Sequence, residues 1–166
     1  MRIAVRQAAA SEKCILQRLL ELNAHDWSEF ARADVDAHGV FGYSYLEAYR
    51  EEPGRYPFHI QARERYAGFV LVNRQCIVMK ERDANSIAEF FVLRKYRRQG
   101  VGRIAAERIF DRFPGYWEVI QHQNNLHSIL FWESVIGRYT AGNYIKRLVT
   151  TAEWDGQALI FCNAKG

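Results

Sequence analysis

The chain has 166 residues, of which 49% are hydrophobic and 25% are charged, and its formal net charge is +4. These proportions are ordinary for a globular protein, so we expect one domain over residues 1–166. No segment approaches the roughly 20 apolar residues of a membrane-spanning helix, and residues 1–13 lack the apolar core of a signal peptide. Three widely spaced cysteines, Cys14, Cys76 and Cys162, predict reduced thiols in a cytoplasmic protein. We also expect no membrane partner.

The chain is predicted to begin with a strand and one or two helices. Residues 2–6 alternate like a short strand, and Ser11 is placed to begin a helix whose apolar residues recur at helical spacing. Residues 23–42 are less regular and contain many acidic and histidine side chains. A further short helix is predicted over residues 43–49.

Three strands follow. The first two are predicted over residues 57–63 and 66–72, and Gly68 in the second indicates a bulge or a close approach of another backbone. Residues 87–93 are apolar except for Glu89 and too few for a typical helix, so they are predicted to form the third strand.

The residues after this third strand carry the strongest functional signal. Four basic side chains fall within residues 94–98, and Gly100 and Gly102 then precede a helix that ends near Phe113. The first amides of a helix have no partner within it and point outward at its positive end, so a phosphate can bind where glycines leave them bare. The alternative is a plain strand, turn and helix with a solvated basic loop.

The C-terminal part is predicted to end in a hairpin. Residues 144–153 and 157–163 form its strands, and Asp155-Gly156 between them is a strong signal for a two-residue turn. The whole order of elements predicts a mixed, twisted sheet covered by helices on both faces.

Much of the excess positive charge lies around the glycine-containing loop. Such a patch could meet nucleic acid, but a nucleic-acid tract would need basic residues spread along a face, whereas a loop at a helix start suits a compact anion. We therefore expect no nucleic-acid partner. The basic residues are Arg94, Lys95, Arg97, Arg98 and Arg103.

Two motifs carry a resemblance to a known family. Residues 97–102, RRQGVG, resemble the R/Q-x-x-G-x-G/A loop of the GNAT superfamily of N-acetyltransferases, in its usual place after a strand that ends in Val92. Residues 125–132, NLHSILFW, resemble the family's N-x-x-A/S-x-x-F-Y helix, and residues 116–120 supply the strand between the two motifs. The resemblance covers about residues 58–151.

The resemblance implies a fold and a reaction. The fold is a mixed α/β one, with a twisted, mostly antiparallel sheet of six to seven strands, helices on both faces and a V-shaped split between the fourth and fifth strands. The reaction is acetyl transfer from acetyl-CoA to a primary amine of a small molecule or peptide by direct attack. By matched position, the Val92 amide donates to the developing oxyanion.

The cofactor-binding residues follow from the same resemblance. A strand backbone meets the pantetheine arm, the loop holds the pyrophosphate, and the following helix contacts the cofactor. The implied residues are Phe90, Phe91, Val92, Arg97, Arg98, Gln99, Gly100, Val101, Gly102, Arg103, Asn125, Ser128 and Trp132.

Two carboxylates are candidates for the base that deprotonates the amine. Glu118 falls at a position that holds a catalytic glutamate in some ribosomal-protein acetyltransferases of the family. Glu89 is expected to share a strand face with Ile87, Phe91 and Leu93, where burial would raise its pKa and make it a better base. Each could instead be a salt-bridged or edge-exposed carboxylate.

One position departs from the family pattern. Trp132 stands where the family often has a tyrosine that protonates the leaving thiolate, and an indole cannot supply that proton. Tyr139, Tyr144 or water are the alternatives. The departure also leaves open a rival function, a non-catalytic acyl-CoA sensor that keeps the cofactor site.

We expect no metal site, because His122 and His127 lack the partners of an HExxH or CxxC motif. The sequence leaves the oligomeric state open between a monomer and a homodimer.

Overall fold

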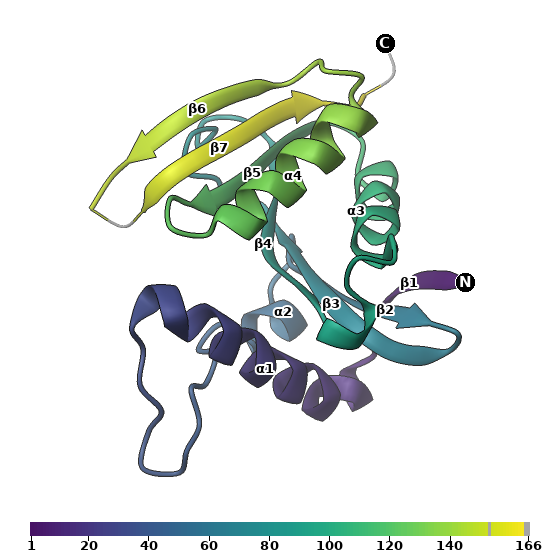
Figure 1. Ribbon diagram of the computed structural model, residues 1–166, viewed down its shortest axis with the longest axis vertical. Coiled ribbons are helices and arrows are strands. Elements are labelled where there is room, and N and C mark those ends of the chain that lie inside the picture. The colour runs from purple at the N-terminus through teal and green to yellow at the C-terminus, as the bar shows by residue number, and fades with distance from the viewer. Residues whose placement is uncertain (153, 165–166) are drawn as a thin grey trace.

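A computed structural model describes residues 1–152 and 154–164 (Figure 1). Seven strands, four α-helices and two short 3-10 helices form this part of the chain. In chain order they are β1 (Ile3–Gln7), η1 (Ala10–Glu12), α1 (Lys13–Ala31), α2 (Ala48–Glu51), β2 (Tyr56–Ala62), β3 (Arg65–Asn73), β4 (Ala84–Val92), η2 (Arg94–Tyr96), α3 (Val101–Arg112), β5 (Tyr116–His122), α4 (Leu126–Tyr139), β6 (Ile145–Thr150) and β7 (Asp155–Cys162).

The strands form one sheet in the order β1-β2-β3-β4-β5-β7-β6. All neighbours are antiparallel except β4 and β5, which are parallel and pair only from Ala84 to Ser86. Beyond Ser86 the two strands diverge, and Figure 1 shows β5 to β7 leaning away from β1 to β3. The predicted mixed α/β fold, with its mostly antiparallel sheet and its split between the fourth and fifth strands, is confirmed.

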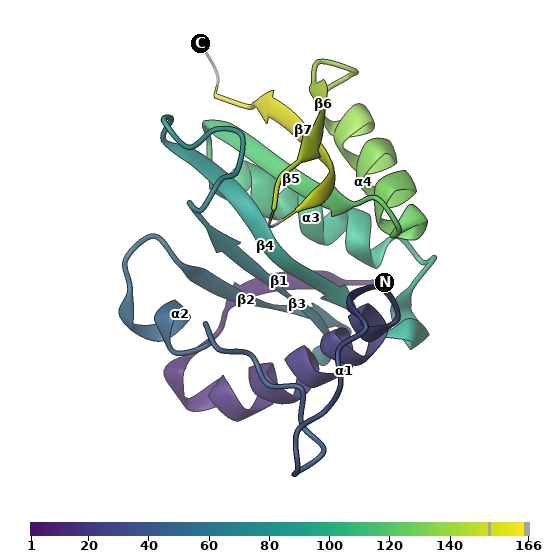
Figure 2. The same cartoon turned by 90° about the vertical axis from the view of Figure 1, so that its left-hand side faces the viewer.

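Helices cover both faces of the sheet, as Figures 1 and 2 show. On one face α3 and α4 pack over a core that includes Phe58, Phe110 and Trp117. On the other face α1 buries its stripe of leucines against Phe69 and Leu71 of β3. Because successive side chains of a strand point to opposite faces and both faces are covered, the centre of β3 is apolar throughout.

The helices differ in length from the prediction. The first one, α1, continues to Ala31 through residues that look irregular in the sequence. Its polar residues are satisfied by contacts with distant segments: Asn23 donates to Glu89, and Asp26 accepts from Arg94 and Arg97. The next helix, α2, has only four residues, so the helix predicted over residues 43–49 is largely wrong.

The predicted two-residue turn at Asp155-Gly156 is also wrong. Both residues belong to β7, where Asp155 pairs with Thr150 and Gly156 with Val149. A Cβ atom at Gly156 would lie 2.0 Å from the Gln121 carbonyl oxygen, so the glycine serves the close approach of β5 and not a turn. The connection therefore falls before Asp155, and residue 153, predicted as the end of a strand, lies outside the described residues.

The close approach predicted at Gly68 is confirmed. A Cβ atom there would lie 2.0 Å from the Phe91 carbonyl oxygen, and the β2–β3 register shifts beside it, between Ile60 and Gln61. Gly68 thus lets β3 and β4 approach closely near the end of β4.

In the part of the chain that the structure describes, no helix combines the length and apolar character that crossing a bilayer requires.

Candidate active site

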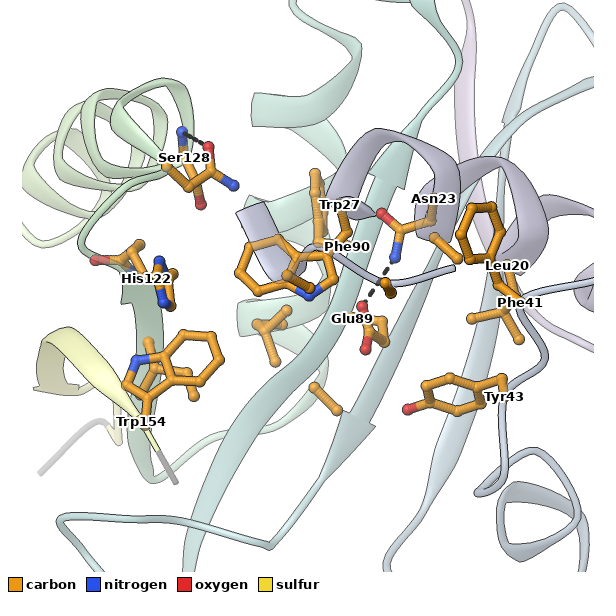
Figure 3. Close-up of a pocket in the computed structure, with 18 of the residues that line it drawn as sticks. Leu20, Asn23, Trp27, Phe41, Tyr43, Glu89, Phe90, His122, Ser128 and Trp154 are labelled. Carbon is orange, nitrogen blue, oxygen red and sulfur yellow. Dashed lines mark hydrogen bonds between the residues drawn. The ribbon is translucent and has the colours of Figure 1, made fainter. Parts of the chain in front are cut away.

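A cavity of about 470 Å³ opens where β4 and β5 diverge, between α1 and the start of α4 (Figure 3). Its lining is mostly apolar and aromatic. The acidic residues in the lining are Asp34 and Glu89, and no lysine or arginine belongs to it among the described residues. The cavity is therefore suited to a neutral or positively charged guest.

A bulge in β4 places Glu89 in this cavity. Leu71 pairs with Glu89 but Val72 pairs with Ile87, so Ala88 is an extra residue. The bulge reverses the alternation: Ile87 joins the core under α3 and α4, whereas Phe91 joins the core under α1. The expectation that Glu89 shares a strand face with Ile87 is therefore wrong, whereas the expectation that it shares one with Phe91 holds.

Glu89 titrates near neutrality in this position. Burial raises its pKa to about 7, although a hydrogen bond from Asn23 Nδ2 to Glu89 Oε2 (2.9 Å) works in the opposite direction. Figure 3 shows the carboxylate beneath Asn23, on the same side of the cavity as Tyr43. A carboxylate with this pKa can accept a proton at neutral pH and release it again.

Glu118, the other candidate base, is not among the residues that line the cavity. Its side chain is 1% exposed and accepts three backbone hydrogen bonds, from the N–H groups of Ile77 (2.7 Å), Val78 (2.9 Å) and Met79 (2.8 Å). This carboxylate holds the loop between β3 and β4 in place.

We expect Glu118→Gln to reduce stability and to leave the turnover of the folded protein intact. The amide would direct a donor at backbone N–H groups and leave at least one of them unpaired, which costs about 1–3 kcal/mol for each buried group. Urea unfolding measures the loss, and Glu52→Gln, which alters an exposed ion pair with Arg55, is the control. Lost turnover at unchanged stability would instead identify Glu118 as the base.

The glycine-containing loop forms a helix start with free amides. Gly100 is the N-cap of α3 with φ +79°, and the first helical bond runs from Ile104 N–H to the Gly100 carbonyl. The preceding Arg98 also has a positive φ, of 59°, and its exposed side chain has no hydrogen bond among the described residues. The amides of residues 101–103 and the Arg98 guanidinium therefore offer donors to an anion.

Gly102 has a packing role as well. A Cβ atom there would lie 3.1 Å from Phe131 Cε2, on α4, and 3.6 Å from Phe90 Cε1. Val101, between the two glycines, is fully buried in the core.

The other polar side chains predicted at this site have partners within the protein. Arg97 donates from Nε to the Val92 carbonyl (2.7 Å) and from Nη2 to Asp26 Oδ2 (2.5 Å). Arg103 pairs with Glu107, and Gln99 donates to the Lys95 carbonyl. Of these three side chains, Arg97 joins the loop to α1, Gln99 bonds within the loop, and Arg103 pairs within α3.

Asp26 remains ionised in this arrangement. Burial opposes its charge, but the hydrogen bonds from Arg97 and Arg94 outweigh burial and hold the pKa of Asp26 below its usual value.

The end of β4 presents free backbone groups to the split. Leu93 N–H donates to the Ala67 carbonyl on β3, and alternate residues of a strand direct their amides to opposite edges. The Val92 and Phe90 amides therefore face the side on which β5 has diverged. The Phe91 side chain is buried against Phe69, so only its backbone is available to a ligand.

The start of α4 completes the cavity. Asn125 caps the helix by accepting from Ser128 N–H (3.1 Å), and both residues line the cavity. Trp132 also belongs to the lining but is only 4% exposed, with its ring 4.9 Å from those of Phe90 and Phe131. It packs in the core at the floor of the cavity.

Neither tyrosine suggested in place of Trp132 lines the cavity. The Tyr139 hydroxyl donates to Asp111 Oδ1 (2.8 Å), and Tyr144 packs against the main core. Tyr43 does line it, and burial together with the charge of Glu89 raises its pKa above the usual value. The sequence gives no sign that Tyr43 lines the cavity, because this residue belongs to no motif.

Sequence reasoning also missed an aromatic trio, Trp27, His122 and Trp154. Trp27 and Trp154 are almost parallel (4°) with ring centroids 6.1 Å apart. His122 stands edge-on to both, at 5.5 Å from each. All three line the cavity, and they lie far apart in the chain. No group of His, Cys, Asp and Glu among the described residues could hold a metal ion.

Comparisons with solved structures agree with this architecture. The ribosomal-protein-S18-alanine N-acetyltransferase of Escherichia coli aligns with a TM-score of 0.61 and 16% identity over 99% of this chain and 96% of that chain. Aminoglycoside acetyltransferase AAC(6')-Ib in complex with coenzyme A aligns with a TM-score of 0.68 and 14% identity, over 97% and 95%. Spermidine N-acetyltransferase from Vibrio cholerae aligns with a TM-score of 0.64 and 8% identity, over 97% and 95%.

At sequence identities this low, the structural alignments show a shared fold alone and not a shared function. No curated protein matches the sequence significantly. A family model described as "Acetyltransferase (GNAT) family" matches residues 16–137, well over half of the chain and including both motifs. The chain therefore belongs to the acetyltransferase (GNAT) family.

Proposed function

We propose that this protein is an N-acetyltransferase that transfers an acetyl group from acetyl-CoA to a primary amine of a small molecule or peptide. The observation that carries the proposal is Glu89, a partly buried carboxylate with a pKa of about 7, in a cavity that opens beside the free edge of β4. The structural neighbours support the same reaction, because two are named as N-acetyltransferases and two were solved in complex with coenzyme A.

The residues present fit coenzyme A. The free amides at residues 101–103 and the Arg98 side chain suit its diphosphate, and the open edge formed by Phe90 and Val92 suits the amide-containing pantetheine arm. Asn125 and Ser128 lie where they could contact that arm from α4. When bound, acetyl-CoA would supply the thioester carbonyl that the amine attacks.

Three residues then have chemical roles. An ammonium ion is drawn to the cavity by its acidic lining, and Glu89 accepts the proton that the nitrogen must lose before it can attack. The Val92 N–H faces the split, where it can stabilise a developing oxyanion. Tyr43 keeps its proton at neutral pH, and we propose that it donates a hydrogen bond to the leaving thiolate, which then takes its proton from water, in place of the tyrosine that Trp132 replaces.

The test combines binding and turnover. We expect coenzyme A to raise the thermal midpoint of the purified protein, and we expect release of free thiol from acetyl-CoA with at least one member of a panel of amines and amino-terminal peptides. Reactions without amine measure background hydrolysis. The second candidate, an acyl-CoA sensor, is favoured by Trp132 and predicts stabilisation by coenzyme A without thiol release on any amine. Absence of both effects would contradict both functions.

A further inference from the structure

The aromatic trio joins the two sides of the split at the cavity. Trp27 comes from α1, on the side of β1 to β4, whereas His122 ends β5 and Trp154 precedes β7. Figure 3 shows His122 and Trp154 together on one side of the cavity, with Glu89 and Tyr43 on the other. The trio and Glu89 therefore lie on different sides of one cavity.

The three rings pack closely against one another. The two indoles are nearly parallel and the imidazole is perpendicular to both, at centroid separations of 5.5 to 6.1 Å. The negative faces of such rings attract a cation within about 6 Å of their centroids, most strongly when it has lost part of its water. Because the rings are too close to admit a cation between them, the trio would hold one on the ring surface that lines the cavity.

The charges around the trio have the sign that a cation requires. Asp34 lines the same cavity, is exposed, and has no hydrogen bond or ion pair among the described residues. The helix α1 ends at Ala31, also in the lining, so its negative end lies at this cavity. No lysine or arginine among the described lining residues opposes this field.

We propose that Trp27, His122 and Trp154 form a cation subsite, which holds a second positively charged group of the acceptor while the reacting amine lies at Glu89. The inference rests on the proposed function, because it assigns the second charge to the acceptor of that reaction. The acceptor class is then an amine with another cationic centre on a short aliphatic spacer, and a singly charged alkylamine is a poor substrate.

A matched pair of acceptors tests this preference. (5-Aminopentyl)trimethylammonium and octylamine each have one amine that can be acetylated, and they differ in the charge and the branching of the distal group. We expect the wild-type protein to use the cationic acceptor with a KM about tenfold lower and with a similar kcat. Trp27→Leu and Trp154→Leu should remove most of this difference, by raising KM for the cationic acceptor and changing KM for octylamine less than about twofold.

Tryptophan fluorescence gives a readout that needs no turnover. Titration with tetramethylammonium, without acyl donor, should change the emission of the wild-type protein saturably and should have a much smaller effect on Trp27→Leu. Tyr116→Leu alters an aromatic residue that is 39% exposed outside the cavity, and is expected to behave as wild type.

The outcomes separate this proposal from the proposed function. Saturable binding of the cation without acetyl transfer on any amine would support the subsite and contradict the enzymatic function. Acetyl transfer with equal KM for the two acceptors would overturn the subsite alone. If Trp27→Leu weakened both acceptors equally and lowered the unfolding midpoint, the trio would only fasten the two sides of the split together.

Discussion

Glu89→Gln is expected to abolish most acetyl transfer and at the same time to stabilise the folded protein above pH 7. Glutamine keeps the shape of the side chain and can still accept the hydrogen bond from Asn23, but it cannot accept a proton from the amine. General-base catalysis typically contributes a factor of about 10² to 10⁴, so we expect kcat/KM at pH 7.5 to fall at least about a hundredfold. Affinity for coenzyme A should be unchanged, because the loop before α3 is untouched.

The gain in stability follows from the raised pKa. The folded-state pKa of Glu89, about 7, lies above its ordinary value of 4.5, so the folded protein binds the proton more tightly than the unfolded chain does. The contribution of Glu89 to the free energy of unfolding is fully present below pH 4.5 and is lost as the pH rises through 7. The loss amounts to at most about 3 kcal/mol, and to less where water in the cavity screens the carboxylate.

Urea unfolding at pH 4.5 and pH 8 measures this difference. Wild type and Glu89→Gln should be similarly stable at the lower pH, and the variant should be the more stable at pH 8. His59 acts in the opposite direction: burial lowers its pKa, so its contribution to stability is lost as the pH falls below about 6.5. Because His59 is present in both proteins, its effect cancels in the comparison.

The pH dependence of turnover identifies the base. In the wild type kcat/KM should rise with pH through about 7, where Glu89 becomes ionised, and this rise should be missing in the residual activity of Glu89→Gln. Asn23→Ala is the companion variant: it removes a hydrogen bond that lowers the Glu89 pKa, so it should move the rise to higher pH. Normal turnover in Glu89→Gln would contradict the assignment, whatever its stability.

The local parts of the site were predictable from the sequence, because their signals are short-range. The apolar run before the basic turn, the two glycines and the helical spacing after them lie within residues 86–115, and each follows from backbone preferences of neighbouring residues. The strand β4, the turn after it and the start of α3 could therefore be predicted before any contact was known, whereas anion binding there stays a prediction.

The residues around the acceptor were not predictable in this way, because each depends on a distant contact. The bulge at Ala88 is fixed by pairing with β3, and it decides which core Ile87 joins. Arg97, predicted to contact the cofactor, pairs with Asp26 of α1. Glu118, predicted as a candidate base, accepts hydrogen bonds from three amides of the loop after β3. Sequence patterns describe what a side chain can do, and the tertiary fold selects one of those roles.

The largest expected effect on cofactor binding is that of Gly100→Glu. Gly100 adopts φ +79°, which a residue with a Cβ atom occupies at a cost of roughly 1–2 kcal/mol, and the nearest atom to such a Cβ, Arg103 Nη2, is 3.9 Å away. Gly100→Ala should therefore bear the backbone strain alone and keep most of the affinity for coenzyme A. Gly100→Glu adds a carboxylate at the positive end of α3, where it competes for the free amides and repels the diphosphate, so we expect at least about a hundredfold weaker binding.

Calorimetric titration of the three proteins with coenzyme A measures the effect. Gly39→Glu is the matched control, because Gly39 has φ +73° with no atom near its Cβ position and does not line the cavity. It carries the same strain and the same added charge away from the loop, so its affinity should equal that of the wild type. If Gly100→Glu bound coenzyme A as tightly as Gly100→Ala, the free amides at the start of α3 would not hold the diphosphate. Coenzyme A would then bind elsewhere on the protein, and the place assigned to its acetyl group beside Glu89 would fail with the loop.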